Sequence, residues 1–271
     1  LPLFGELVGP SPVPGYFAPD MICREITLGK IKSFLEEFTF GVSMIGASGI
    51  DGIELHAHQG YLLDEFMTAR TNSRADEYGG NLEGRLKLIL EMINAVKMAC
   101  GPDFPISVRY GLTHKLENEM DGGRTIEEGL EIARRLEKAG VSALHIDAGV
   151  YETNNWAQPP TTQADGCLVE LAALVRKTVG IPVIAVGKLG NPVLAETVLK
   201  EGKADFIALG RPLLADPQWP NKVLKKRAVE IRPCLSCNEG CLARTFKGKT
   251  ISCAVNPCCG NEQTLTVEKS S

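Results

Sequence analysis

The sequence predicts an α/β fold built on a parallel sheet, and it favours a β/α barrel over a doubly wound sheet. From about residue 50 onward, short apolar runs alternate with segments of helical period. These runs are hydrophobic nearly throughout, which is typical of parallel strands buried on both faces. Each run ends in a polar residue or a glycine, as in barrels whose strand ends carry functional groups, and no GxGxxG turn follows the first run.

The expected elements follow one another in regular order. A helix is expected over 27–47, ahead of the first strand. The predicted strands cover 50–58, 104–111, 142–149, 181–187 and 204–210. The predicted helices after them cover 82–99, 124–140, 166–180, 191–202 and 218–230. Residues 1–49 carry no strand signal, so the sequence predicts five strand–helix units where a complete barrel has eight.

Periodicity and capping support the helices. In 82–99 the apolar residues that recur on one stripe are Leu86, Leu88, Ile89, Met92, Ile93 and Val96. In 124–140, Thr125 stands three residues before Glu128, the spacing of a capping box. Gly140 is expected to end that helix.

Composition narrows the class of protein. The chain has 271 residues, a net charge of −4 and no apolar run near the roughly 18 residues of a membrane span. We therefore expect no nucleic-acid partner and no membrane association. Nine cysteines, an odd number, fit poorly with a set of structural disulfides. With no signal peptide at the N-terminus, this pattern predicts a reducing, cytoplasmic location.

The first predicted strand leads into polar residues and a long loop. His56 and His58 alternate along the strand and should point the same way. They could bind a metal, but no third ligand has a convincing spacing, so hydrogen bonding to a substrate carbonyl or a cofactor is favoured. Tyr61, just beyond the strand, could donate a proton to a developing carbanion or could simply plug the barrel.

The later strand ends carry cationic residues. Arg109 ends a buried strand and needs an anionic or acceptor-rich partner, either a ligand or a neighbouring carboxylate. Gly187 with Lys188 and Gly210 with Arg211 each lie where a strand gives way to a helix. Such turns let backbone N–H groups approach a phosphate, although ordinary tight turns remain the alternative.

A cysteine cluster follows the last predicted helix. Cys234, Cys237 and Cys241 lie in CLSCNEGC, and Cys253 follows in ISCAVNPCCG. Zinc sites of four cysteines usually combine two CxxC hairpins, and only one is present here. The pattern therefore favours an iron–sulfur cluster, with a zinc site as the alternative.

Several linked motifs resemble the old yellow enzyme family. They are HQGYLLDEF, TNSRADEYGGNLEGR, SVRYG, GKLGNP, GRPLLADP, CLSCNEGC and ISCAVNP. The chain is similar to the iron–sulfur branch, which includes 2,4-dienoyl-CoA reductase, enoate reductases and bile-acid-inducible NADH-dependent flavin oxidoreductases. The resemblance implies a (β/α)8 TIM barrel of the FMN-linked oxidoreductase type, in which the five predicted strands correspond to strands four to eight.

The resemblance also implies roles for individual residues. Tyr61 matches the family's proton donor, and His56 matches a residue that holds the substrate carbonyl. Arg109 matches an arginine beside the flavin. The substrate-binding candidates are His58, Gln59 and Tyr151, where Gln59 departs from the family's usual His or Asn. The residues that match the family's phosphate-binding turns are Gly187, Lys188, Gly210 and Arg211. The residues that match its 4Fe–4S ligands are Cys234, Cys237, Cys241 and Cys253.

The function implied is NAD(P)H-dependent reduction of the C=C bond of an α,β-unsaturated carbonyl compound. The substrate would be an enoate, a dienoyl-CoA or a 3-oxo-4-ene steroid or bile acid. The expected cofactors are FMN and the 4Fe–4S cluster, and a full-length enzyme would also use FAD and NAD(P)H. A homo-oligomer is a further possibility that the family implies. Two alternatives stay open, a zinc-stapled non-catalytic fragment and a flavin-free phosphate-binding lyase or isomerase.

The expected domain organisation follows from the same resemblance. Residues 1–230 would form part of the FMN barrel, 231–260 the cluster-binding segment and 261–271 the start of a further region. We therefore expect an internal piece of a longer enzyme, with weak or absent FMN binding and little or no activity by itself.

Overall fold

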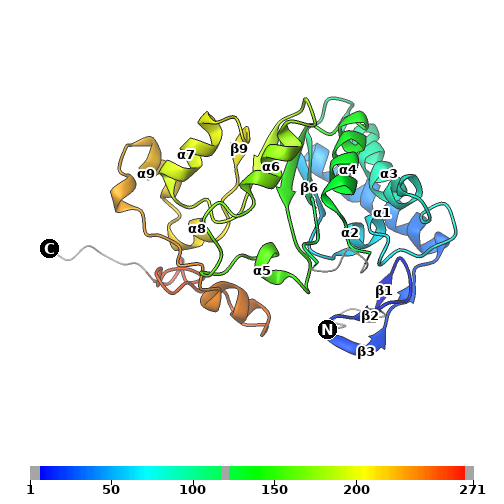
Figure 1. The fold of residues 1–271 in the computed structure, drawn as a ribbon, viewed down its shortest axis with the longest axis horizontal. Coiled ribbons are helices and arrows are strands. Elements are labelled where there is room, and N and C mark those ends of the chain that lie inside the picture. The colour runs from blue at the N-terminus through cyan, green and yellow to red at the C-terminus, as the bar shows by residue number, and fades with distance from the viewer. Residues whose placement is uncertain (1–6, 117–121, 266–271) are drawn as a thin grey trace.

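The structure, a computed structural model, describes residues 7–116 and 122–265 (Figure 1). Its centre is a five-stranded, wholly parallel sheet in the order β5-β6-β7-β8-β9. The strands are β5 (Ile53–Ala57), β6 (Ile106–Gly111), β7 (Ala143–Asp147), β8 (Val183–Ala185) and β9 (Phe206–Ile207). Every predicted strand is present, and each pairs with its neighbours in the chain. The prediction of a parallel α/β sheet is thus confirmed.

Long helices pack on the sheet and on one another. They are α1 (Leu28–Ala47), α3 (Leu82–Cys100), α4 (Ile126–Lys138), α6 (Val169–Arg176) and α7 (Pro192–Lys200). Their apolar stripes enclose a core with the strands, in which Leu86, Ile106 and Ile132 are fully buried. The Thr125 cap is confirmed, because its hydroxyl accepts from the Glu128 amide at 3.2 Å. The Glu128 carboxylate does not complete the capping box; it pairs with Arg85 at 2.6 Å.

The two faces of the sheet differ in exposure. On β5, Leu55 and Ala57 are buried in the core, whereas Glu54 and His56 alternate with them and are exposed. Arg109 lies beside His56 in the register of β5 and β6, so the polar side chains share a face. The strands therefore present one apolar face to the helices and one polar face away from them.

The N-terminal segment differs from the prediction, which expected no strands before residue 50. Two short pairs are present, β1 (Val8–Gly9) with β4 (Arg24–Glu25) in parallel, and β2 (Pro14–Gly15) with β3 (Ala18–Ile22) as an antiparallel hairpin. Arg74 holds this segment against the domain by donating to the carbonyls of Pro10 at 3.0 Å and Ile26 at 2.7 Å. Strand pairs this short do not produce a recognisable alternation of apolar and polar residues in the sequence.

Short helices were also missed. They are α2 (Leu62–Met67), α5 (Asn154–Ala157), α8 (Arg211–Ala215) and the π-helical turn η3 (Glu239–Ala243). The single helix predicted over 218–230 is divided into α9 (Trp219–Leu224) and the 3-10 turn η2 (Ala228–Glu230). No helix in the described ranges is both long and apolar enough to cross a membrane.

Asp216 fixes the path from the sheet to the cysteine-rich segment. Its carboxylate is buried and accepts from the Gln218 amide at 3.1 Å, the Arg232 amide at 2.9 Å and Lys222 Nζ at 2.6 Å. The chain thus leaves α8, makes the α9–η2 excursion and returns to the same carboxylate. The cysteine-rich segment starts from this fixed point, and residues 266–271 of the predicted 261–271 region lie outside the described residues.

Candidate active site

A cavity of about 560 Å³ lies at the carboxyl ends of the strands. This volume is within the usual range for a site that holds a small molecule or cofactor. The predicted site residues that line it are His56, His58, Gln59, Arg109, Gly187, Lys188, Gly210, Arg211 and Cys234. With Asp147 at the end of β7, residues from all five strand ends of the sheet therefore meet at one place, as the barrel interpretation requires.

Asp147 organises the cationic side of the cavity. Arg109 Nε lies 3.1 Å from Asp147 Oδ2, and His58 Nδ1 lies 3.1 Å from the same oxygen. Burial acts to raise the pKa of the Asp147 carboxyl, but His58 and Arg109 outweigh it and lower that pKa. The carboxylate partner that the sequence left open for Arg109 is thus Asp147, and the pair points the guanidinium into the cavity.

The two histidines lie side by side, with ring centroids 4.2 Å apart. Burial, and then the neighbouring His58, lower the pKa of His56, so His56 is a neutral imidazole at neutral pH. His58 is 2% exposed, and its contact with Asp147 falls outside hydrogen-bond geometry, so neither ring nitrogen has a hydrogen-bond partner among the described residues. Buried polar atoms are normally satisfied, so the His58 ring is suited to a ligand that enters the cavity.

Tyr61 lies next to the cavity at the start of α2. Its ring meets that of His56 edge to face, with centroids 4.9 Å apart, and Tyr151 lies 6.0 Å away. The chain turns sharply just before it, with positive φ angles at Gln59 and Gly60. The Gln59 amide donates to the Ala157 carbonyl at 3.0 Å and so ties this turn to α5.

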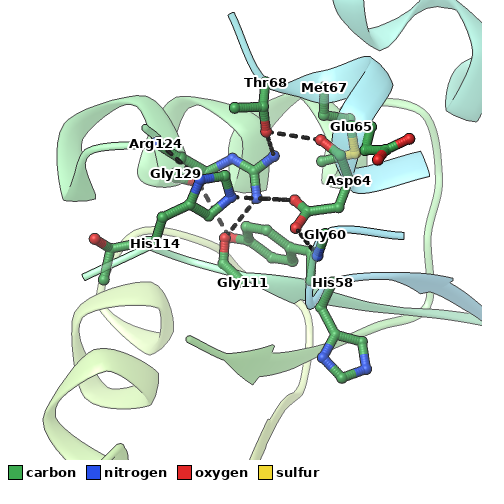
Figure 2. Close-up of polar contacts among 12 residues, drawn as sticks. His58, Gly60, Asp64, Glu65, Met67, Thr68, Gly111, His114, Arg124 and Gly129 are labelled. Atoms are coloured by element: carbon green, nitrogen blue, oxygen red, sulfur yellow. Dashed lines mark hydrogen bonds and ion pairs between the residues drawn. The ribbon is translucent and has the colours of Figure 1, made fainter. Parts of the chain in front are cut away.

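A buried ion cluster holds this turn in place (Figure 2). Asp64 accepts from the Gly60 amide at 2.8 Å and pairs with Arg124 Nη1 at 2.7 Å. Arg124 also donates to the Gly111 carbonyl at 2.7 Å and to the Thr68 hydroxyl at 3.1 Å. The loop after β5 and the loop after β6 are thereby joined through one arginine.

His114 completes the ion cluster. Its Nδ1 accepts from the Arg124 amide at 3.2 Å, so the proton of the neutral ring sits on Nε2, which faces Asp64 at 3.4 Å. Burial acts to raise the pKa of Asp64, but Arg124 and His114 lower it far below its ordinary value. Asp64 is therefore a permanent buried anion. No sequence motif predicts this cluster, because its members lie up to 60 positions apart.

The glycines of the two predicted phosphate turns differ in their surroundings. Gly187 has φ of 109°, and a Cβ there would lie 2.9 Å from Leu168. A Cβ at Gly210, which precedes α8, would meet no atom within 4 Å, so that turn is open. Lys188 Nζ contacts the Gln163 carbonyl while also lining the cavity. These features fit a phosphate at the edge of the cavity.

The four predicted cluster cysteines gather around a second, small pocket. Its lining includes Cys234, Cys237, Cys241 and Cys253, together with Arg211. Cys234 and Arg211 line both this pocket and the large cavity. In the described residues no group of three or more potential ligands converges on a single metal ion.

Hydrogen bonds hold the cysteine-rich segment against the loop between α5 and α6. The Thr161 hydroxyl donates to the Leu235 carbonyl at 2.7 Å, and the Asn238 amide donates to the Gln158 carbonyl at 3.1 Å. Arg211 donates to the Pro159 carbonyl at 2.8 Å and also to the Asn238 side chain. The wall between the cavity and the small pocket is therefore shared and well anchored.

Comparisons with known proteins agree with this geometry. A model of the NADH:flavin oxidoreductase / NADH oxidase family matches residues 9–230. The cinnamate reductase of Clostridium sporogenes is 41% identical over 273 residues, which cover 97% of this chain and 41% of that protein. The NADH oxidase of Thermoanaerobacter brockii is 44% identical over 256 residues, or 94% of this chain and 39% of that protein.

A solved structure of a 2-naphthoyl-CoA reductase complex superposes with a TM-score of 0.88 and 32% identity. The match covers 95% of this chain and 38% of that chain. The chain thus spans about two fifths of the length of the relatives it matches.

Proposed function

The chain belongs to the NADH:flavin oxidoreductase / NADH oxidase family, and from this premise we propose that it reduces the C=C bond of an α,β-unsaturated carbonyl compound. The observation that carries the proposal is that His56 and Arg109 line one cavity while the ring of Tyr61 packs edge to face on His56. The names of relatives, cinnamate reductase and 2-naphthoyl-CoA reductase, point to conjugated acids or their thioesters as substrates. Membership in a flavin family favours this reading over a flavin-free lyase or isomerase.

The cavity offers the contacts that FMN would need. Arg109 would contact the flavin ring, and Gly187, Lys188, Gly210 and Arg211 would hold the phosphate. When bound, FMN supplies the hydride that goes to the β-carbon of the substrate. His58 Nε2 is buried without a hydrogen-bond partner among the described residues, which supports a ligand at this position.

The remaining residues would act on the substrate itself. His56, a neutral imidazole, would donate a hydrogen bond to the carbonyl oxygen, where negative charge develops during the reaction. Gln59 and His58 border the same space. Tyr61 would transfer the proton of its hydroxyl to the α-carbon, so that the C=C bond gains one hydride and one proton.

The four cysteines would hold a 4Fe–4S cluster, which supplies single-electron transfer to the flavin site. Their shared pocket supports this assignment, and Cys234 separates that pocket from the cavity. NAD(P)H and an FAD group would provide the electrons in the whole enzyme. Free thiols throughout the described residues suit a reducing compartment such as the cytoplasm.

Replacement of Tyr61 by phenylalanine tests the proposal. In the Tyr61→Phe holoenzyme, flavin reduction by NAD(P)H should be retained, whereas enoate reduction should fall by about a hundredfold or more, because only the proton donor is lost. Stopped-flow absorbance of the flavin separates the two half-reactions. Reoxidation by ferricyanide, which needs no proton at carbon, is the control and should be unchanged. Retained enoate turnover would refute the role of Tyr61.

A further inference from the structure

Four aromatic side chains form a continuous surface that the proposed chemistry does not use. This aromatic rim consists of Tyr16, Phe17, Tyr151 and Phe246. Tyr16 stacks on Tyr151 with centroids 5.6 Å apart, and Phe17 meets Tyr151 edge to face at 5.0 Å. Phe246 lies 6.2 Å from Phe17. The rim therefore joins the N-terminal hairpin, the loop after β7 and the cysteine-rich segment.

The rim is open to solvent. Phe17 is 70% exposed, Phe246 55% and Tyr16 49%. Scattered exposed aromatic residues are common, but aromatic residues from three distant segments that touch one another form a patch, and such patches mark binding sites. Aromatic rings in edge-to-face contact also leave ring faces free to stack on a further ring.

The rim is continuous with the proposed catalytic residues. Tyr151 lies 6.0 Å from Tyr61, and Tyr61 lies 4.9 Å from His56. A series of ring contacts thus runs from His56 through Tyr61 and Tyr151 to Phe17. Arg70 and Glu152, which follows Tyr151 in the chain, form an ion pair at 2.9 Å.

We propose that the aromatic rim binds a planar aryl group on the β-carbon of the substrate and thereby makes the enzyme prefer aryl enoates to alkyl enoates. This inference rests on the proposed function, because it assumes that the C=C bond lies at Tyr61. Tyr16, Phe17 and Phe246 would then be specificity-determining residues supplied from outside the barrel strands.

Cinnamate and crotonate provide a matched test, since they share the carboxylate and the double bond and differ in a phenyl against a methyl group. In Phe17→Ala, kcat/KM for cinnamate should fall about five- to tenfold, the scale of one aromatic contact, while that for crotonate stays nearly unchanged. Phe17→Leu, which keeps apolar bulk but no ring face, should lie between. Phe40→Ala, at a 68% exposed phenylalanine of α1, is the control and should match the wild type.

Binding measured without turnover separates the two proposals. Calorimetric titration with 3-phenylpropanoate, the saturated product of cinnamate, should give a weaker Kd for Phe17→Ala than for Phe40→Ala. If the wild type reduces neither enoate, the proposed function fails, and the calorimetric titration alone tests whether the aromatic rim binds an aryl group. Equal effects on cinnamate and crotonate, or equal Kd values in the two variants, would overturn the rim proposal. Thermal unfolding at the wild-type temperature would show that the variants are folded.

Discussion

Asp64 is the residue whose loss should cost the fold most. Its partner Arg124 has no exposed side-chain surface, so Asp64→Ala would leave a buried cation without its counter-ion. We expect a loss of about 3–5 kcal/mol in the free energy of unfolding, measured by urea denaturation. Glu131→Ala is the matched control, because it removes a carboxylate from an exposed pair with Arg135 and should change stability little. Similar losses in both variants would contradict a special role for the ion cluster.

Glu65 should make stability depend on pH in the opposite sense to most carboxylates. Burial, and then the charge of Asp64, raise the pKa of Glu65 from 4.5 to about 7. Between these values the native state binds a proton that the unfolded chain has released, so stability falls as the pH rises through that window. Glu65→Gln keeps the side chain neutral at every pH and removes this dependence.

Urea denaturation of both proteins at about pH 4.5 and pH 8 checks the expectation. The variant and the wild type should be similar at the lower pH, and the variant should be the more stable at the higher pH. A stability difference that is the same at both pH values would show that Glu65 ionises normally.

At the level of elements, α4 is seated on the sheet through Gly129. A Cβ at this position would lie 2.1 Å from the Leu112 carbonyl oxygen, and the Tyr110 hydroxyl donates to the Gly129 carbonyl at 3.0 Å. Gly129→Ala should therefore destabilise by about 1–3 kcal/mol, although alanine is the better helix former. Gly41→Ala in α1 is the control, because a Cβ there meets no atom within 4 Å and should stabilise by about 0.5–1 kcal/mol. Unfolding curves that move in the same direction would contradict this packing argument.

The sequence predicts those helices and strands whose own residues show a hydrophobic pattern. Apolar runs located every strand of the main sheet, and a helical stripe located α3, because both are long enough to show a period. The start of α2 has no such signal, since it depends on Asp64 capping the Gly60 amide across a turn. The two-residue strands near the N-terminus depend likewise on tertiary contacts such as those of Arg74.

Some features of the candidate site could likewise be predicted from the sequence, and others could not. Residues at the ends of parallel strands must lie near one another, so the meeting of His56, Arg109 and Arg211 at one cavity could be predicted. The partner of Arg109 could not be predicted, because many carboxylates could have reached it. The aromatic rim could not be predicted either, since Tyr16 and Phe246 are 230 positions apart, and only folding brings Tyr16 to Tyr151 and Phe246 to Phe17.

For the molecule as a whole, the cysteine-rich segment should bind iron through four of its six cysteines. The anaerobically purified enzyme should be brown and contain about four iron atoms per chain. Cys241→Ser should lower the iron content and bleach the colour. Cys258→Ser should leave both unchanged, because Cys258 is outside the lining of the small pocket. Stoichiometric zinc in a colourless protein would instead support a zinc site.

Because Asp216 binds both ends of the α9–η2 excursion, the length of this excursion can vary between related proteins. The excursion over residues 217–231 begins and ends at one carboxylate, and its surface includes the strongly exposed Leu224 and Val229, 81% and 98%. Lengthening a loop whose ends are already fixed costs little closure entropy. Insertions and deletions can therefore accumulate in this excursion without moving the cysteines. The cysteine-rich segment can keep its position on the domain while the polypeptide before it changes in length and sequence.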